Sequence, residues 1–249
     1  NAYKNVIVNG IVLAEDGKKM SKRLNNYPDP MEEFDKFGAD AMRYYLLTSP
    51  VMQAENLNFT EKDLAEISRR TFRMLWNSYG FFVLYSNLNK IQITDLRVEK
   101  NSENILDKWI ISELNILLKK VNAHMEKYEL VQAARLFSSF IDDLSNWYLR
   151  RSRNRFKESD KKSFITLHYV LVELVKAMAP FTPFVTEEIY KTLTGEESVH
   201  LADYPVASEE KISEKLSQEM EDLRNLVEKG LAARNVLKIR VRQPLSAAK

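Results

Sequence analysis

Cysteine is absent from the 249-residue sequence, and this absence excludes two kinds of architecture. Without thiols the chain has neither a disulfide framework nor a thiolate metal site. The three histidines are scattered along the chain, so we expect no histidine zinc site and no other metal centre. Six glycines and seven prolines are few for this length, which favours long helices over turn-rich sheets.

Long apolar runs are also missing, and no stretch is long enough to span a bilayer. Lys4, Asn5 and Asn9 interrupt the apolar residues at the start of the chain, which argues against a signal peptide. We therefore expect a soluble, cytoplasmic protein with no membrane partner. The net charge is only +2, so only local clustering of charge can indicate a nucleic-acid partner.

The first such cluster covers residues 18–23, where three lysines and one arginine follow Gly17 directly. Glycine can adopt positive φ and lets the backbone turn sharply at this point. Lysines on such a turn are compact, mobile charges that suit a polyphosphate whose charge moves during a reaction. The alternative for a hexamer of this composition is a solvated basic loop without a ligand.

The string Lys19-Met20-Ser21-Lys22-Arg23 resembles the KMSKS loop of class I aminoacyl-tRNA synthetases, with Arg23 in the place of the motif's last serine. The continuation LNNYPDP, residues 24–30, resembles the isoleucyl branch of that family. The segment GADAMR, residues 38–43, is similar to the stem-contact region that joins the catalytic domain to a helical bundle. The resemblance extends through most of the chain.

The resemblance implies a reaction in which an amino-acid carboxylate attacks the α-phosphate of ATP and expels pyrophosphate. Mobile ammonium groups over the leaving group stabilise the transition state more than the ground state. The resemblance assigns this catalytic role to Lys19 and Lys22, and it assigns ATP contacts to Lys19, Met20, Ser21 and Lys22. Met20 would be a packing anchor and Ser21 a hydrogen-bond donor, while the role of Arg23 stays open.

The family pairs this loop with an HIGH-type motif, and no His-x-Gly-His occurs in the sequence. The histidines, His124, His168 and His200, all lie far downstream of the loop. We therefore expect a fragment of a ligase that is inactive alone and binds no ATP stably. In the full-length enzyme the resemblance implies ATP with Mg, isoleucine and tRNA(Ile) as partners, and a monomer.

A second cluster of charge covers residues 150–162, with seven basic residues against two acidic ones. At helical spacing Arg150 and Arg153 share one face, and Arg151 and Arg155 share another. Arginine forks fit phosphates, and unpaired bases stack on aromatic or guanidinium planes. Basic residues at a helix C-terminus also complement the helix dipole without any ligand, so both interpretations are open.

The string NWYLRRSRNRF, residues 146–156, resembles the family's anticodon-binding helix. The resemblance implies tRNA contacts from the following side chains: Trp147, Arg150, Arg151, Arg153, Arg155 and Lys157. Trp147 stays open between core packing and base stacking. We expect Arg151 and Arg155 to lie opposite the core stripe of Phe140, Leu144 and Tyr148, so that removing both leaves the fold intact.

A third basic pattern is the alternation of Lys238, Arg240 and Arg242 with apolar residues, which predicts a strand. Its basic face either follows a phosphate backbone or is a solvated edge protected by charge. A hairpin is predicted between 6–8 and 11–13, because Asn-Gly separates two β-branched runs. An extended segment is predicted at 198–201.

Capping residues and apolar periodicity predict the helices. Asp29 with Pro30 and Thr60 are the clearest N-terminal signals. The expected helices are one that starts at Pro30 and ends before Gly38, then 39–47, 61–88, 106–125, one from about 130 through the basic cluster, 164–178, 187–193 capped by Thr186, and 209–234. Residues 87–101 are expected to form a polar connection.

These patterns predict a mainly α protein: a helical bundle of the anticodon-binding type, preceded by a small α/β stem-contact segment that carries the KMSKR loop. The expected domains are the end of a catalytic domain with the stem contact (1–55), the bundle (56–200) and the start of a C-terminal region (201–249). Alternatives are a fragment of a valyl or leucyl enzyme, a free-standing RNA-binding helical module, and a helical interaction protein.

Overall fold

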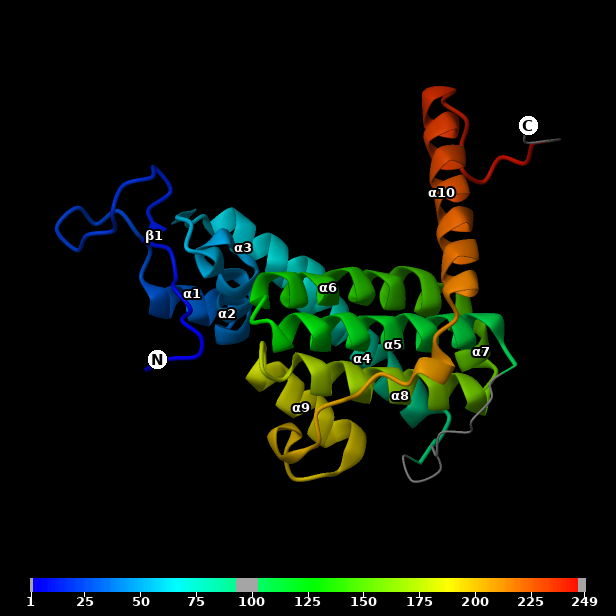
Figure 1. Cartoon of the computed structure of the whole chain (residues 1–249). Helices are drawn as coiled ribbons and strands as arrows, with labels where there is room; N and C mark the ends of the chain where they lie inside the picture. The colour runs from blue at the N-terminus through cyan, green and yellow to red at the C-terminus, as the bar shows by residue number, and fades with distance from the viewer. Residues whose placement is uncertain (1, 93–102, 246–249) are drawn as a thin grey trace.

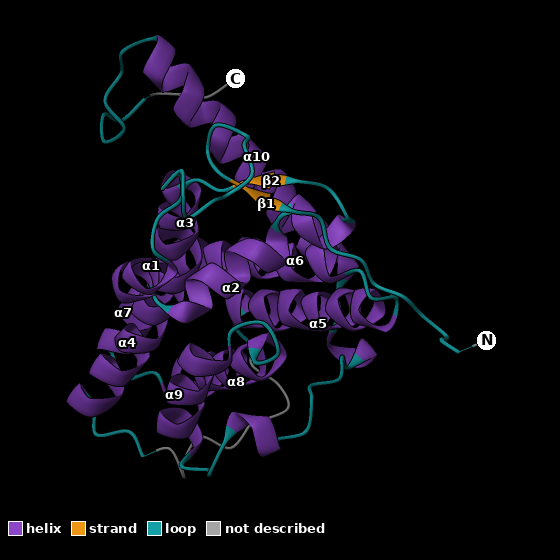
Figure 2. Cartoon of the chain, turned by 90° about the vertical axis from the view of Figure 1, so that its left-hand side faces the viewer, coloured by secondary structure: helices purple, strands orange, loops and turns teal. Residues whose placement is uncertain are grey.

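Helices account for most of the described chain, as the scarcity of glycine and proline predicts (Figure 1). The computed structural model describes residues 2–92 and 103–245. A helical bundle follows a small α/β segment at one end, so the predicted fold class is confirmed. Within the described residues, the sheet consists of β1 (Val12–Leu13) and β2 (Leu57–Asn58), which pair in parallel (Figure 2).

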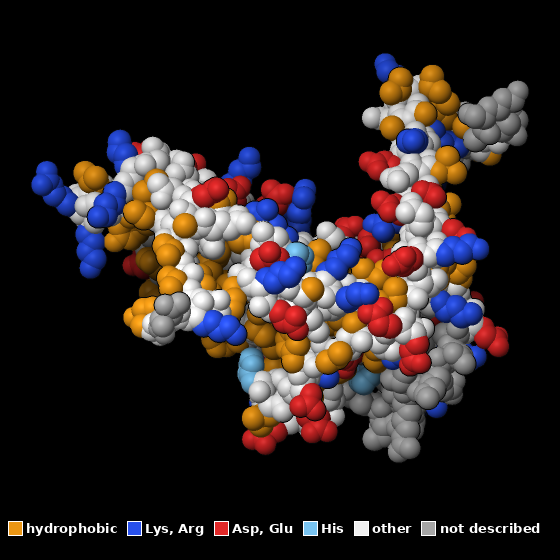
Figure 3. All heavy atoms as spheres, in the orientation of Figure 1, with side chains coloured by type: hydrophobic (Ala, Val, Ile, Leu, Met, Phe, Trp, Pro, Cys, Tyr) orange, Lys and Arg blue, Asp and Glu red, His pale blue; other side chains and the backbone are white. Residues whose placement is uncertain are grey.

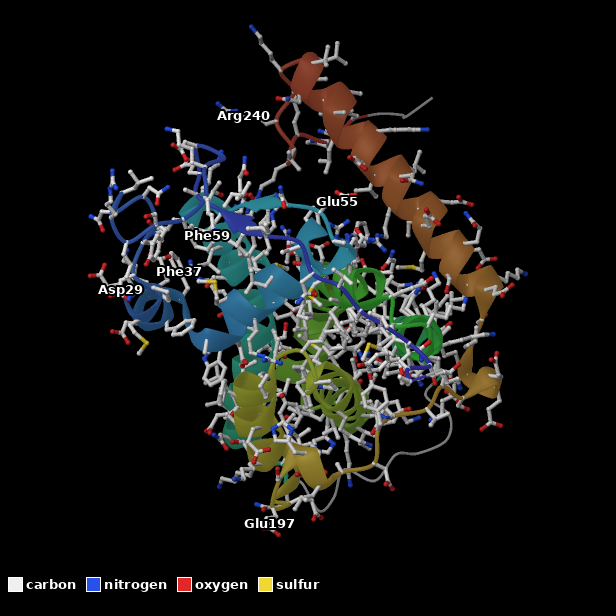
Figure 4. All side chains as sticks on the ribbon, turned by 60° about the vertical axis from the view of Figure 1, so that its left-hand side comes forward. Asp29, Phe37, Glu55, Phe59, Glu197 and Arg240 are labelled. Atoms are coloured by element: carbon white, nitrogen blue, oxygen red, sulfur yellow. The ribbon has the colours of Figure 1, made fainter. Side chains whose placement is uncertain are left out.

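The predicted hairpin at Asn9-Gly10 is wrong, because β1 pairs with a strand 45 residues away. Residues 6–8 belong to no strand and their side chains are exposed. Gly10 donates its N–H to the Val51 carbonyl at 2.7 Å, and a Cβ at Gly10 would lie 1.7 Å from the Glu55 carbonyl oxygen. The glycine therefore permits a close backbone approach to Glu55, which precedes β2. Figure 4 labels Glu55 and Phe59, which lie on either side of this strand.

Two short helices follow the lysine loop: α1 (Pro30–Phe37) and α2 (Ala39–Thr48). Asp29 caps α1 as predicted, since its Oδ1 accepts the Met31 N–H at 2.8 Å. Gly38 separates the two helices with a φ of 85°, a conformation that favours glycine. The α2 helix extends one residue beyond the predicted end and stops before Ser49-Pro50.

The predicted helix 61–88 is present, but a π-helical turn interrupts it. Its parts are α3 (Glu61–Ile67), the π turn Ser68–Phe72 and α4 (Arg73–Leu88). A second rod has the same construction, with α6 (Leu130–Asp142), the π turn Asp143–Leu149 and α7 (Arg150–Lys157). Each π turn contains an extra residue and changes which side chains face the core, a shift that apolar periodicity did not reveal.

Four further helices complete the described structure: α5 (Ile105–Glu126), α8 (Lys161–Met178), α9 (Pro183–Thr194) and α10 (Glu214–Val236). None of the helices in the described ranges is long and apolar enough to cross a bilayer. The predicted polar connection lies partly at residues 93–102, outside the described ranges.

The start of α9 differs from the prediction. Thr186 is buried inside the helix, where its hydroxyl donates to the Thr182 carbonyl at 2.6 Å, and it is not the cap. The N–H groups of Phe184 and Val185 donate instead to the Asp40 carboxylate of α2, at 3.1 and 2.6 Å. Burial raises the pKa of Asp40, although these two donors oppose the rise. The α/β segment is thus attached to the bundle by a helix cap supplied from a distant residue.

Three further predictions near the C-terminus are corrected. Residues 199–201 form a 3₁₀ turn and not an extended segment. The charged helix begins at Glu214 with Ser213 as its N-cap, because residues 209–211 form a separate 3₁₀ turn. Residues 238–242 form turns and no strand, with Lys238 at a φ of 55°.

The bundle has one large core to which helices from α2 to α10 contribute, with Trp109, Phe137 and Phe164 among its fully buried side chains. A smaller cluster around Tyr45 and Phe59 lies beneath the α/β segment. Most of α10 projects from the bundle, as Figure 1 shows, and its apolar side chains beyond Met220 are exposed (Figure 3).

Candidate functional site

The lysine loop starts where β1 ends, and backbone hydrogen bonds define its turn. Gly17 donates its N–H to the Ala14 carbonyl at 2.9 Å, and Ala14 donates to the Lys18 carbonyl at 2.9 Å. Gly17 has a φ of 78°, the conformation expected from the sequence. The Lys18 ammonium lies 2.9 Å from the Asp16 carboxylate, so its charge has a partner within the loop.

The second half of the loop is held by the side chain of Asn26. Its Oδ1 accepts the Ser21 N–H at 2.9 Å, and its Nδ2 donates to the Lys19 carbonyl at 3.2 Å. Met20 is half-buried against the small core cluster. The backbone from Lys19 to Ser21 is therefore positioned by Asn26 and by the packing of Met20.

Lys19, Lys22 and Arg23 are exposed, and none of them forms an ion pair with another residue of the described ranges. Basic side chains gather at this end of the molecule in Figure 3. Ammonium groups without acidic neighbours can bind the oxygens of a polyphosphate without first breaking an internal contact. The loop therefore presents three available positive charges on a defined backbone.

The arginine cluster lies at the opposite end of the bundle, on α7 (Figure 1). Arg150, Arg153 and Lys157 are exposed and form no ion pair with other described residues. Their spacing of three and four residues places them on one face of the helix. This face offers three positive charges to solvent.

Arg155 has a different environment, and its expected orientation opposite the core stripe is wrong. Its guanidinium donates to both oxygens of the Asp107 carboxylate, each at 2.7 Å, and to Asp160 at 2.8 Å. Asp107 is fully buried and also accepts the Tyr148 hydroxyl at 2.9 Å. Burial lowers the pKa of Arg155, but the hydrogen bonds and charge of Asp107 outweigh it and raise the pKa above the ordinary value. Arg155 therefore joins α7 to α5.

Trp147 and Arg151 contact each other directly. The Arg151 guanidinium lies 3.7 Å from the centre of the Trp147 ring, and Arg224 of α10 lies 5.2 Å from the same centre. Trp147 is half-buried and packs against the core. The choice between core packing and stacking, which the sequence left open, is therefore not exclusive, because one part of the ring packs inward and another part stays exposed. Burial, and then the charges of Arg150 and Arg224, lower the pKa of Arg151.

Arg224 is a residue that the sequence analysis missed. It pairs with Asp143 and helps to line a groove of about 600 Å³ between α10 and the bundle, together with Trp147 and Glu113. Arg224 is one of many charged residues in its helix, so the sequence did not indicate that it contacts Trp147. The packing of α10 on α5 brings the two residues together. The third basic segment lies at the tip of α10, where Figure 4 labels Arg240.

Two protein families match the chain. The family of class I tRNA synthetases (I, L, M and V) matches residues 1–58, and the anticodon-binding domain of tRNA ligases matches residues 107–249. The two matches cover the lysine loop and the arginine cluster, respectively.

The curated relatives described below are both named isoleucine–tRNA ligase. An isoleucine–tRNA ligase of Protochlamydia amoebophila is 46% identical over 255 residues, covering 99% of the chain and 24% of the relative. An isoleucine–tRNA ligase of Chlamydia trachomatis serovar L2 is 45% identical over 256 residues, covering 98% of the chain and 24% of the relative. The chain thus spans about a quarter of the length of the relatives it matches.

Two solved structures have a similar fold. The ternary LeuRS–tRNA–LeuAMS complex of Agrobacterium radiobacter K84 gives a TM-score of 0.61 at 24% identity, over 82% of the chain and 24% of the synthetase. The methionyl-tRNA synthetase of Mycobacterium tuberculosis, with methionyl-adenylate, gives a TM-score of 0.58 at 22% identity, over 73% of the chain and 36% of that protein. Both likenesses concern the fold.

Proposed function

The chain belongs to the class I tRNA ligase family with its anticodon-binding domain, and from this membership we propose that it works within an isoleucine–tRNA ligase. The full-length enzyme would activate isoleucine with ATP and transfer it to tRNA(Ile). This proposal is supported by identities of 45–46% to isoleucine–tRNA ligases over almost the whole chain. We propose further that the chain is inactive alone and that the enzyme is a monomer of the cytoplasm.

The first part of the proposed role is ATP activation by the lysine loop. Lys19 and Lys22 would bind the phosphates as pyrophosphate leaves, when negative charge on the leaving group is greatest. The observation that carries this role is that both ammonium groups are exposed, have no acidic partner within residues 2–92 and 103–245, and extend from a backbone held by Asn26. Met20 would anchor the loop, and the hydroxyl of Ser21 would donate to a phosphate oxygen.

A magnesium ion accompanies ATP in the proposed reaction, but the loop does not fit a Mg²⁺ site. Its exposed groups are mostly ammonium and guanidinium groups, whereas Mg²⁺ prefers carboxylate and phosphate oxygens. Of the two acids in the loop, Asp16 is paired with Lys18, which leaves Glu15 as a single carboxylate. The loop residues therefore act on phosphate oxygens alone in this proposal.

The second part of the proposed role is tRNA binding by α7. Arg150, Arg153 and Lys157 would contact phosphates from the exposed face of the helix. Trp147 and Arg151 would contact tRNA at the edge of the same surface, with Arg151 stacked on the ring. Arg155 would act by holding α7 in position through Asp107. We propose the boundaries 1–55, 56–200 and 201–249 for the catalytic end, the bundle and the C-terminal region.

Substrate specificity is tested in the full-length ligase by pyrophosphate exchange with isoleucine, valine and leucine and by charging of purified tRNAs. We expect exchange with isoleucine and charging of tRNA(Ile). A clear preference for valine or leucine would assign the chain to a sister enzyme. Charging of none of the three tRNAs would favour the free-standing RNA-binding module or the helical interaction protein.

The tRNA surface is tested with Arg150→Gln/Arg153→Gln in the same protein. Each lost phosphate contact should reduce the salt dependence of binding by about one unit of slope. Lys215→Gln on α10, whose side chain is 87% exposed, is the control and should bind as the parent does. Parental binding by the double variant at every salt concentration would contradict the proposed surface.

A further inference from the structure

A second basic surface lies on the rod formed by α3 and α4, outside both proposed sites. From residue 67 to residue 89 the sequence contains three arginines and no acidic residue. These arginines, Arg69, Arg70 and Arg73, are all exposed. Arg70 pairs with Glu66 at 3.0 Å, whereas Arg69 and Arg73 form no ion pair or hydrogen bond with another residue in the described parts of the chain.

The π turn Ser68–Phe72 explains why these side chains point outward. Thr71 is buried, and its hydroxyl lies 2.9 Å from the Ser138 hydroxyl of α6. With this contact, the face of the rod that carries Thr71 packs against the bundle, and Arg69, Arg70 and Arg73 lie on the outer face. Apolar periodicity predicted one helix over residues 61–88 and gave no reason to single out these arginines.

The three arginines form one wall of a groove between α4 and α6. The groove has a volume of about 580 Å³, and its lining residues are Arg69, Arg70, Arg73, Met74, Asn77 and Asp142. Three guanidinium groups thus face a single carboxylate. That carboxylate, Asp142, already accepts a hydrogen bond from the Asn146 amide at 2.6 Å. Because Arg70 is paired with Glu66, the excess positive charge of the groove comes from Arg69 and Arg73, and Asp142 is the one carboxylate in the lining of the groove.

The groove lies on the same two rods as the proposed tRNA surface. Thr71 contacts Ser138, and the Asn89 amide donates to the Phe156 carbonyl at 3.1 Å, so the two rods run side by side in the same direction. Arg150 lies eight residues after Asp142, about 12 Å further along its rod at the rise of a helix. A phosphate backbone bound in the groove can continue from there to Arg150.

We infer that this groove binds backbone phosphates of the tRNA, at a place separate from α7. The inference rests on the proposed function, since it takes tRNA as the partner. Arginine forks bind phosphate oxygens through paired hydrogen bonds, and such contacts fix the orientation of an RNA without reading its sequence. The surface would hold the body of the tRNA while α7 contacts it elsewhere.

An acidic protein partner is the alternative occupant, and a neighbouring groove allows the two to be distinguished. Arg73 also lines a groove of about 540 Å³ with apolar walls that include Phe72, Trp76 and Phe184. Trp76 is 46% exposed. An interface with a protein would depend on this exposed tryptophan, because buried aromatic side chains dominate protein interfaces.

The test uses Arg69→Gln/Arg73→Gln in the full-length ligase, with tRNA binding measured over a series of salt concentrations. We expect weaker binding at low salt and a slope reduced by up to about two units, one for each lost phosphate contact. Trp76→Ala should leave the slope unchanged. The control Lys215→Gln/Lys229→Gln removes the same charge from exposed positions on α10 and should keep the parental slope. Thermal melting checks that each variant is folded.

Backbone footprinting locates the contact. The phosphates that lose protection in Arg69→Gln/Arg73→Gln should differ from those that lose protection in Arg150→Gln/Arg153→Gln. The inference is overturned if the first variant keeps the parental slope and footprint, or if the α10 control flattens the slope equally. Loss of polyglutamate binding together with unchanged tRNA binding would assign the groove to an acidic protein and also overturn it. Absence of salt-dependent tRNA binding by the parent would instead contradict the proposed function itself.

Discussion

The lysine loop and helix α7 carry similar densities of positive charge but hold that charge in different ways. In the loop, Lys19, Lys22 and Arg23 have no acidic partner among the described residues. On α7, Arg155 is bound to Asp107 and Asp160, and Arg151 is stacked on Trp147. A cluster of basic residues in a sequence therefore does not specify how many of its charges are available to a ligand.

The physical reason lies in how each element buries its residues. A helix packed in a bundle turns some of its side chains inward, and a long arginine there must find a buried acid. A loop that leaves a strand edge can keep its side chains in solvent while its backbone forms the contacts. The four predictions below test this difference between a charge that stabilises the fold and a charge that is available for chemistry.

The largest expected effect is that of Arg155→Ala on stability. Removing the guanidinium leaves the fully buried Asp107 without its bidentate partner, and loss of one member of a buried pair costs about 3–5 kcal/mol. Denaturant unfolding of the chain measures this cost. The matched control is Arg153→Ala on the exposed face, which should change the free energy of unfolding by less than about 0.5 kcal/mol. Equal stability of the two variants would remove the distinction drawn for α7.

Lys22→Ala should act on chemistry and leave stability unchanged. In the full-length ligase we expect turnover in isoleucine-dependent pyrophosphate exchange to fall about 100- to 1000-fold, the typical cost of losing one transition-state contact. The KM for ATP should change little, because charge on the leaving group develops in the transition state. Lys18→Ala is the control, since Lys18 is paired with Asp16. Unchanged turnover with a raised KM for ATP would contradict the role of Lys22.

Asn26→Ala tests whether the loop backbone must be held for its lysines to act. The variant removes the hydrogen bonds to Ser21 and Lys19, each worth about 1 kcal/mol. We expect faster hydrogen exchange at the Ser21 amide and a turnover reduced about tenfold. Parental exchange at Ser21 would show that the packing of Met20 alone is enough to hold the loop.

The smallest expected effect is on the pH dependence of the free energy of unfolding, and it comes from His168 in the bundle. Burial lowers the pKa of His168 below its ordinary value of 6.5, although its Nε2 lies 2.8 Å from the Leu193 carbonyl. Below pH 6.5 the unfolded chain therefore binds a proton that the folded chain resists, and stability falls as the pH falls. His168→Gln should flatten this slope between about pH 5 and 6.5 in denaturant unfolding. His200→Gln, at an exposed position, should retain the slope.

Local sequence was sufficient for the caps of α1 and α3, for the presence of the long helices and for the turn of the lysine loop. Asp29 caps α1, Thr60 caps α3 through the Asp63 N–H, and Gly17 turns the loop at positive φ. Each of these interactions joins residues at most four positions apart, so the residue types alone indicate them. The periodic apolar residues likewise predicted the long helices, because any helix with one apolar face must bury it.

Contacts between distant residues were decided by the tertiary structure alone. The parallel pairing of β1 with β2, the capping of α9 by Asp40 and the bond from Arg155 to Asp107 join positions 45 to 145 residues apart. Nothing in the local residue pattern distinguishes these partners from other apolar runs or other carboxylates. Packing selects them, because a buried charge or an unpaired backbone group must be satisfied by whichever element the fold brings beside it.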